Sequence, residues 1–338
     1  MSKLEITDLE IKYRTEEGVN HAVNGVSLEL EENETLGLVG ESGSGKTTVA
    51  EAILGILPSN AKITNGSIVY DGTDLTELSE KELREYRWAH ISMIPQSSMN
   101  ALDPVYRVGT QIVEIIRAHE NVSKREARDR AADLFETIGI GSDRLDDYPH
   151  QLSGGMKQRA MIALSLALDP KIVLADEPTT ALDVIIQKRI LGRIKEIQRS
   201  RDMAMLLITH DVSVVAETCD KIAVFYAGNL VEFADAESVI NHPTHPYTLG
   251  LRNAFPSLSK KTDLISIPGV PPEMSEYRDQ CQFADRCPFA IEECYEQEPH
   301  LSPVNDGHYT SCHRAYEADQ LRGRAAQPDT WKHMEGEQ

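Results

Sequence analysis

The stretch Gly40-Glu41-Ser42-Gly43-Ser44-Gly45-Lys46-Thr47 decides the fold. It has the spacing G-x-x-x-x-G-K-S/T and stands between an apolar run, Thr35–Val39, and a helical pattern that begins near Thr47. The glycines let backbone N–H groups turn inward around phosphates, Lys46 supplies positive charge to the β- and γ-phosphates, and the Thr47 hydroxyl can ligate Mg²⁺. The helix adds its dipole. A chance glycine-rich turn would lack these flanks, so the pattern predicts a nucleotide-binding loop. The nucleotide-binding residues expected in it are Gly40, Ser42, Gly43, Ser44, Gly45, Lys46, Thr47 and Thr48.

The rest of residues 1–240 is typical of an α/β domain with a largely parallel sheet, because short apolar runs alternate with helical patterns. The runs Ile172–Ala175, Met205–Ile208 and Ile222–Tyr226 predict further buried strands. The segment Lys124–Ile138 predicts a helix whose apolar face belongs to the core rather than to a binding surface. That face consists of Ala127, Ala131, Leu134, Phe135 and Ile138.

Two acidic residues follow one of these predicted strands. Asp176 and Glu177 come directly after Ile172–Ala175, at the carboxyl end of a strand, where open α/β sheets bind ligands. Asp176 would hold Mg²⁺, directly or through water, and Glu177 would polarise the attacking water. A solvated acidic turn is the alternative, and the apolar run before the pair disfavours it. His210 also follows a predicted strand, but alone it indicates a structural histidine rather than a catalytic one.

A second candidate phosphate-binding element is Leu152-Ser153-Gly154-Gly155-Met156, which precedes the helical pattern of residues 157–168. Ser153 can cap that helix, and the two glycines let its exposed N–H groups approach an anion closely. One chain has little use for two such elements on one nucleotide, so we expect the second to serve an ATP held by a partner. Ser-Gly-Gly alone leaves an ordinary capped helix as the alternative.

The composition restricts the class of protein. The chain has 338 residues, of which 41% are hydrophobic and 26% charged, and this predicts a globular protein with one large domain and an appendage, or two domains. Its 34 Lys and Arg against 54 Asp and Glu give a formal net charge of −20, which disfavours a nucleic-acid role. No apolar run reaches the length of a membrane helix and the start lacks a signal peptide's apolar core, so we expect a soluble cytosolic chain.

Together and in this order, the motifs resemble those of an ABC ATPase, and the resemblance covers residues 1–240. It implies a P-loop core with a helical subdomain at about 97–170, and a dimer that ATP closes and hydrolysis releases. It implies that Tyr13 stacks on adenine, although a strand aromatic without this role remains the alternative. The further residues that the resemblance assigns to the nucleotide and its Mg²⁺ are Gln96 in the loop before the helical subdomain, Ser153, Gly154 and Gly155 in the signature motif, Asp183 in the interface loop Ala181-Leu182-Asp183, and His210 at the γ-phosphate.

Three other segments resemble those of oligopeptide and dipeptide importer ATPases: residues 94–104, His245-Pro246-Tyr247-Thr248, and the Cys-x5-Cys-Pro segment that begins at Cys281. The resemblance implies a peripheral subunit on the cytoplasmic face of the membrane. Its implied partners are a second, related but non-identical ATPase, two membrane permease subunits and, indirectly, an external solute-binding protein, with no nucleic acid. The region around Gln96 and Met99–Tyr106 would receive a short helix of a membrane subunit.

The function that follows is ATP hydrolysis that powers solute import. The solute is a peptide by resemblance alone, because related importers also carry oligosaccharides or nickel. The alternative is a non-transport ABC ATPase that acts in DNA repair, translation or iron–sulfur assembly. The sequence weighs against it because it has no long coiled-coil insertion, no second ATPase domain and no basic stretch.

The composition of the sequence changes after Val239, because prolines there interrupt regular secondary structure. We therefore expect a boundary near Asn241, with the ATPase domain at 1–240 and a C-terminal extension at 241–338. His242 and His245 are expected to belong to a proline-rich turn rather than to bind a metal. The polar segment Ala315–Gln338 predicts a helix followed by a frayed tail.

Four of the five cysteines, Cys281, Cys287, Cys294 and Cys312, lie in the C-terminal extension, whereas Cys219 stands apart and indicates a buried thiol. In a reducing compartment this clustering favours a metal over disulfides. Four thiolates suit either a 4Fe–4S cluster or a zinc ion. The resemblance implies the cluster; zinc is the second interpretation and four unligated thiols the third. We expect a structural role, so that loss of one ligand would loosen this segment before it alters the chemistry at Lys46 or Glu177.

Overall fold

The computed structural model describes residues 3–16, 18–96, 101–179, 184–254 and 265–332. The chain divides into two compact units. Unit 1 comprises Met1–Lys3, Leu30–Glu34 and Glu77–Leu207, and unit 2 comprises Leu4–Glu29, Thr35–Thr76 and Ile208–Gln338.

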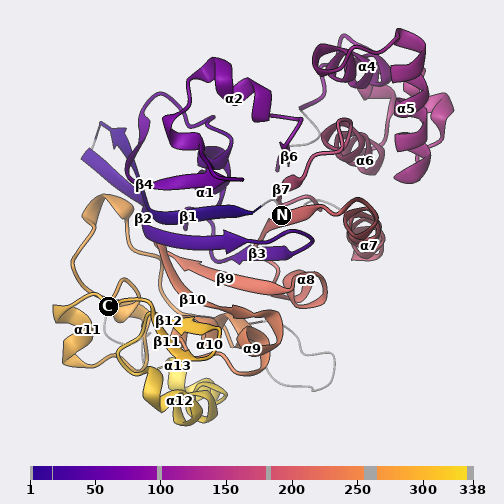
Figure 1. The fold of residues 1–338 in the computed structure, drawn as a ribbon. Helices are drawn as coiled ribbons and strands as arrows, with labels where there is room; N and C mark the ends of the chain where they lie inside the picture. The colour runs from indigo at the N-terminus through magenta and orange to yellow at the C-terminus, as the bar shows by residue number, and fades with distance from the viewer. Residues whose placement is uncertain (1–2, 17, 97–100, 180–183, 255–264, 333–338) are drawn as a thin grey trace. The chain divides into compact units, whose positions relative to one another are not determined.

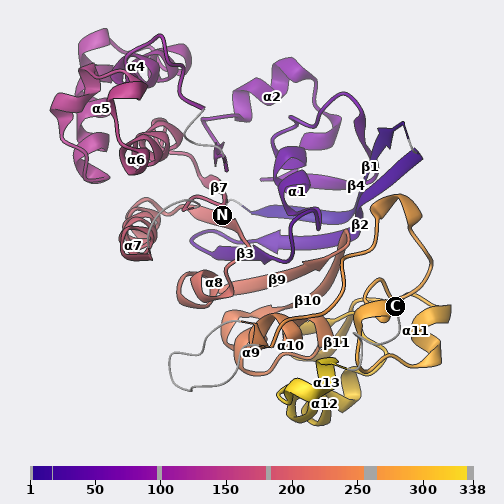
Figure 2. The ribbon, with the colours of Figure 1, turned by 180° about the vertical axis from the view of Figure 1, so that it is seen from behind.

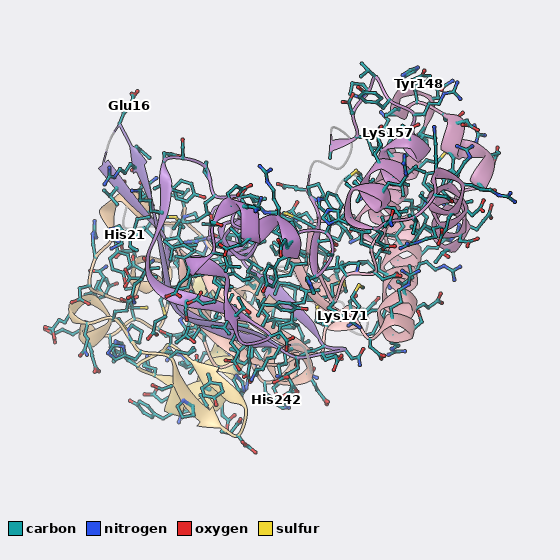
Figure 3. All side chains as sticks on the ribbon, turned by 45° about the horizontal axis from the view of Figure 1, so that its top comes forward. Glu16, His21, Tyr148, Lys157, Lys171 and His242 are labelled. Carbon is teal, nitrogen blue, oxygen red and sulfur yellow. The ribbon has the colours of Figure 1, made fainter. Side chains whose placement is uncertain are left out.

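Unit 1 combines a helical group with parallel strands (Figure 1). Its elements are α2 (Glu80–Tyr86), β6 (Ile91–Ile94), α4 (Val108–His119), α5 (Lys124–Thr137), α6 (Gly154–Ser165), β7 (Ile172–Asp176), α7 (Val184–Arg201) and β8 (Ala204–Thr209), whose last residues belong to unit 2. The strand order is β8-β7-β6, and β6 runs parallel to β7. Helices α4, α5 and α6 pack on one another, and Tyr148 and Lys157 lie in this helical group (Figure 3).

Helix α5 confirms the helix expected over Lys124–Ile138. The Ser123 hydroxyl accepts a hydrogen bond from the Glu126 N–H at 3.1 Å and caps the helix N-terminus. All five residues of the expected apolar face are buried, and Phe135 is fully enclosed. Burial of one such side chain stabilises the fold by about 1.5–3 kcal/mol, so this face belongs to the core.

Unit 2 contains two sheets and the C-terminal elements (Figure 2). Its elements are β1 (Leu4–Thr15), β2 (Gly18–Leu30), β3 (Thr35–Val39), α1 (Lys46–Ile53), β4 (Ala61–Tyr70), β5 (Thr73–Asp74), α8 (Val212–Thr218), β9 (Lys221–Tyr226), β10 (Asn229–Asp235), α9 (Ala236–Asn241), α10 (Pro246–Asn253), α11 (Glu292–Glu296), β11 (Ser302–Asn305), β12 (His308–Thr310), α12 (Ala318–Ala325) and α13 (Pro328–Lys332). Glu16 marks the tip of the β1–β2 hairpin (Figure 3).

The two sheets of unit 2 differ in direction. One has the order β2-β1-β4-β5, with β1 antiparallel to β4. The other has the order β11-β12-β10-β9-β3, with β3 parallel to β9 and β10 antiparallel to both β9 and β12. Strands β3, β7, β8 and β9 confirm the four strands expected from the apolar runs, and β3 is buried along its whole length.

The C-terminal extension packs within unit 2. Strand β12 pairs with β10, so that Thr310 lies opposite Glu232, and this places residues on both sides of Asn241 in one sheet. The compact units therefore divide the chain elsewhere than at the expected boundary, and the division into domains 1–240 and 241–338 stays a prediction.

The expectation of one helix and a frayed tail after Ala315 is wrong for the described part of that segment. Two helices, α12 and α13, follow, and the Trp331 ring is only 2% exposed. Its indole N–H donates to the Ala325 carbonyl at 2.9 Å, which ties α13 to the end of α12. A few widely spaced apolar residues anchor this end, so no clear period shows in the sequence.

Candidate functional site

The motif Gly40–Thr47 lies at the junction of β3 and α1 in unit 2, as its sequence context predicts: Gly40–Gly45 join the two elements, and Lys46 and Thr47 begin α1. Gly40 and Gly45 have φ of +151° and +98°, values that residues with a side chain rarely adopt. A Cβ atom would lie 2.1 Å from the Phe225 carbonyl oxygen at Gly40, and 2.2 Å from the Ala22 carbonyl oxygen at Gly45. Both positions therefore require glycine for steric reasons.

Lys46 is held beneath this loop. Its ammonium group donates to the Gly40 carbonyl at 2.9 Å, the Glu41 carbonyl at 2.7 Å and the Ser44 hydroxyl at 3.0 Å, and the residue is 7% exposed. These three partners are oxygen atoms of the loop itself, and they fix the Lys46 ammonium group against the loop. Ser42, Gly43 and Thr47 are exposed at the loop surface, where a nucleotide can reach them.

Tyr13 lies beside the first turn of α1. Its hydroxyl is 3.3 Å from the Thr48 hydroxyl, and its ring is half-buried. The aromatic residue expected at adenine is thus next to the phosphate-binding element. This position is compatible with stacking on a base, and the role stays a prediction.

The register of β6 and β7 brings Gln96 and Glu177 together in unit 1. Ile94 lies opposite Ala175, so the residues two positions further along each strand are level with one another. The Gln96 amide donates to the Glu177 carboxylate at 2.9 Å. Asp176, the last residue of β7, is 2% exposed. Glu177, expected at the attacking water, and Gln96, expected at the nucleotide and its Mg²⁺, therefore meet at the ends of adjacent strands.

Glu177 has a left-handed backbone, with φ of +45°. This conformation costs a residue with a side chain roughly 1–2 kcal/mol. Such strain often occurs at functional sites, where the surrounding structure holds a residue in place. The strained turn follows the buried strand directly and leads into Pro178.

The signature segment supplies a second helix N-terminus. Ser153 is the N-cap of α6, and its hydroxyl accepts a hydrogen bond from the Met156 N–H at 3.4 Å. Ser153 and Gly154 are exposed, whereas the later turns of α6 are buried. The buried later turns therefore hold α6 in place, while its N-terminus is exposed to solvent. The helix dipole favours an anion at that end.

His210 follows β8 and is exposed, and the next residue, Asp211, caps α8. Asp183, with Ala181 and Leu182, lies outside the described residues, as does Met99. Their expected roles stay predictions.

The four C-terminal cysteines line one small cavity in unit 2, here named the cysteine cavity. Its lining residues are Cys281, Cys287, Cys294, Cys312, His245, Pro246, Phe283, Phe289, His313 and Arg314. The Cys281 N–H donates to the Cys294 carbonyl at 3.0 Å, and the Arg314 N–H donates to the Cys312 sulfur at 3.4 Å. Four residues separated in sequence thus meet in space, and all of them are free thiols.

Burial controls the chemistry of these thiols. It raises the pKa of Cys281 to about 12 and that of Cys312 to about 11, and it raises the pKa of Cys287 well above its usual range. Thiolates in this cavity therefore require a compensating cation. Among the described residues, no compact group of three or more His, Cys, Asp or Glu side chains has the spacing of a metal site. Cys219 is buried elsewhere, as expected.

His245 was expected only to belong to a proline-rich turn, but the structure also places it at the cysteine cavity and at the start of α10. It is 1% exposed, it lines the cysteine cavity, and its Nδ1 accepts a hydrogen bond from the Tyr247 N–H at 3.0 Å, which caps α10. Burial lowers its pKa to about 4, so the ring is neutral and Nδ1 can accept. His242, in contrast, is the C-cap of α9.

A buried carboxylate that the sequence reasoning missed ties this region to the sheet. Glu232 of β10 is fully buried, and its Oε1 accepts from the Thr244 N–H at 2.7 Å and lies 2.7 Å from Nε2 of His308 on β12. Its Oε2 accepts from the His245 N–H at 2.9 Å. The signal available in the sequence was one acid inside the apolar strand segment Leu230–Ala234, since a charge there needs partners.

Two phosphate-binding elements in one chain distinguish ABC-type ATPases from other P-loop proteins, and the protein is of that class. Residues 23–180 match the family model described as ABC transporter, and residues 231–294 match that of the oligopeptide/dipeptide transporter C-terminal region. The dimeric structure of MJ0796, a bacterial ABC transporter cassette, is similar at a TM-score of 0.64 and 27% identity, over 69% of this chain and 98% of that one.

Two curated relatives specify the family. The probable peptide ABC transporter ATP-binding protein y4tR of Sinorhizobium fredii is 45% identical over 94% of this chain and 96% of its own length. The dipeptide transport ATP-binding protein DppD of Escherichia coli is 42% identical over 93% of this chain and 97% of its own length. The chain belongs to the ATP-binding subunits of oligopeptide and dipeptide ABC transporters.

This family membership confirms the expected fold, ATP hydrolysis and role in transport, and it does not support the alternative of a non-transport ATPase. Such a subunit is peripheral to the membrane, on its cytoplasmic face. Within the described part of the chain, no helix is both long and apolar enough to cross a bilayer.

Proposed function

We propose that this protein powers peptide import as one half of an ATP-clamped dimer. The single observation that carries the proposal is the presence of two phosphate-binding elements, Gly40–Thr47 and the open N-terminus of α6. In the proposed dimer, each nucleotide lies on the loop of one subunit and is covered by the signature helix of the other. Closure then depends on ATP, and hydrolysis releases it.

In the proposed chemistry, different residues bind the phosphates, hold Mg²⁺ and activate the attacking water. Lys46 and the loop N–H groups neutralise the phosphates, while Thr47 and Asp176 hold the Mg²⁺ that supplies charge stabilisation. Glu177 accepts a proton from the attacking water as general base. The hydrogen bond from Gln96 orients the Glu177 carboxylate. Tyr13 would stack on adenine and His210 would contact the γ-phosphate.

The proposed partners are a second, related ATPase, two membrane permease subunits and an external solute-binding protein. A heterodimer is the arrangement that the resemblance to the oligopeptide and dipeptide importers implies. The segment after Gln96 supports a permease contact, since Val105 and Tyr106 are 70% and 50% exposed. Both side chains are therefore accessible to a protein partner. The relatives named for peptide and dipeptide transport support a peptide as the solute.

Nucleotide-dependent association tests the proposed dimer. We expect the Glu177→Gln subunit, mixed with its partner ATPase, to form a stable dimer in light scattering with ATP and Mg²⁺, and to separate with ADP. Addition of Ser153→Arg to this subunit would place a large side chain at the signature helix and is expected to prevent the dimer while ATP binding persists. Association that is the same with and without ATP would refute the clamp.

We also propose that the cysteine cavity holds a 4Fe–4S cluster. The support is that all four cysteines line one cavity, together with Phe283, Phe289 and His245. Four thiolates suit either the cluster or a single zinc ion, and the resemblance to importer ATPases favours the cluster, with zinc as the alternative. When bound, the cluster would cross-link the loops of the C-terminal extension.

Metal analysis tests this assignment. We expect protein purified without oxygen to contain about four iron and four sulfide per chain, in line with the stoichiometry of the cluster. Stoichiometric zinc without iron would establish the zinc alternative. Protein that is folded and contains neither metal would refute both.

A further inference from the structure

Glu41, the second residue of the phosphate-binding loop, is held by the C-terminal extension. Its carboxylate forms a two-bond fork with the Arg286 guanidinium, with Nη1 at 2.8 Å from Oε2 and Nη2 at 3.1 Å from Oε1. Its backbone N–H donates to the Tyr247 hydroxyl at 2.9 Å. Its carbonyl accepts from the Lys46 ammonium at 2.7 Å. Side chain, N–H and carbonyl are thus all engaged, and the first two bind residues of the extension.

The Arg286 guanidinium is itself fixed. Arg286 is 7% exposed, Nε donates to the Pro268 carbonyl at 2.9 Å, and Nη1 donates to the Tyr226 hydroxyl at 3.2 Å. A planar guanidinium with its donors occupied has one orientation, and the fork transmits that orientation to Glu41. The fork is a partly buried anchor, because the Arg286 side chain is 7% exposed and the Glu41 side chain 27% exposed.

The anchor is continuous with the cysteine cavity. Arg286 immediately precedes Cys287, and both are buried. Phe283, which lines the cavity, packs on Tyr226 and Tyr247 with ring centroids 5.2 and 5.4 Å apart. The same two tyrosines contact Arg286 and Glu41 through their hydroxyls. One packed group therefore links the cavity wall to the loop.

We propose that Arg286 is a positioning residue for ATP binding, which acts through Glu41 and holds the phosphate-binding loop in its nucleotide-competent conformation. The expectation was that the extension loosens before the chemistry at Lys46 changes; the proposal instead couples the two directly, because Lys46 donates to the same Glu41 whose carboxylate Arg286 holds. The proposal rests on ATP binding at this loop but not on the dimer. Equilibrium binding to the isolated subunit therefore tests it separately from the clamp.

The expected effect follows from the population of competent loops. If only about one loop in ten is competent after the fork is lost, the apparent Kd for ATP rises about tenfold. Simple electrostatics predicts the opposite for Glu41→Gln, because the substitution removes a negative charge beside a site for an anion. Weaker ATP binding by Glu41→Gln would therefore indicate a positioning role, whereas tighter binding would indicate a simple charge effect.

The experiment measures the Kd for ATP of Glu41→Gln, Arg286→Lys and the double variant by fluorescence titration. Glu41→Gln retains the size of the side chain, and Arg286→Lys retains the charge but loses the fork. We expect each to weaken binding about tenfold, and the double variant to be no weaker than either, because both remove one interaction. In the assembled transporter, KM for ATP should rise while kcat stays within about twofold of wild type.

Glu80→Gln is the matched control, because Glu80 forms a similar fork with Arg87, at 2.8 and 3.0 Å, in the other unit. Its Kd should equal that of wild type. Wild-type or tighter ATP binding by folded Glu41→Gln would overturn the proposal. A loss of kcat at unchanged KM, or an equal weakening in Glu80→Gln, would overturn it as well.

Discussion

Gly45→Ala tests the phosphate-binding loop with a single methyl group. The new Cβ atom would lie 2.2 Å from the Ala22 carbonyl oxygen, whereas real Cβ contacts are essentially never below 3.0 Å. Loop and strand β2 must therefore separate by roughly 1 Å, and a displacement of that size in a binding geometry can cost about 100-fold. We expect the Kd for ATP to rise about 100-fold, which corresponds to about 2.8 kcal/mol.

The assay is a titration of the purified subunit with a fluorescent ATP analogue, together with thermal unfolding in the absence of nucleotide. Gly72→Ala is the control, since Gly72 also has a positive φ, +81°, but a Cβ there meets nothing within 4 Å. It should lose about 1 kcal/mol of stability through backbone strain and bind ATP normally. If Gly45→Ala binds ATP within twofold of wild type, the steric reasoning is wrong.

Three other substitutions separate binding from hydrolysis. Glu177→Gln should retain ATP binding and lose about 100-fold or more of the turnover of the assembled complex, because it removes the general base; a rate near wild type would remove Glu177 from that role. Lys46→Ala should weaken ATP binding itself, measured by titration, because it removes the positive charge directed at the phosphates; unchanged affinity would contradict this. Ser153→Ala removes the cap of α6 and should leave ATP binding by the isolated subunit unchanged, while turnover in the complex falls on the order of tenfold; a weaker Kd in the isolated subunit would place Ser153 on the wrong nucleotide.

Features that depend on neighbouring residues were predictable from the sequence. The glycines of the loop, the strand before it and the helix after it lie within about twenty residues, and each constrains the next. The same holds for the cap at Ser153 and the apolar face of α5, since helical spacing and capping are local properties.

Features that depend on distant pairs were not predictable. The Arg286–Glu41 fork joins residues 245 positions apart, and the Glu232–His308 contact joins residues 76 apart. No periodicity or local motif relates such positions; only the packing of the C-terminal extension on the sheet brings them together. Trp331 was missed for the same reason, because its burial depends on Ala325 and Phe289 rather than on a helical period.

In the proposed dimer, one subunit contributes halves to two different ATP sites. The most direct test is the ATPase rate of the purified subunit, measured alone over a range of concentrations and then with its partner ATPase and membrane subunits. We expect a low rate for the subunit alone and a large increase in the assembled complex, and we expect Ser153→Arg to abolish this increase without loss of ATP binding. Full turnover by a demonstrated monomer would contradict it.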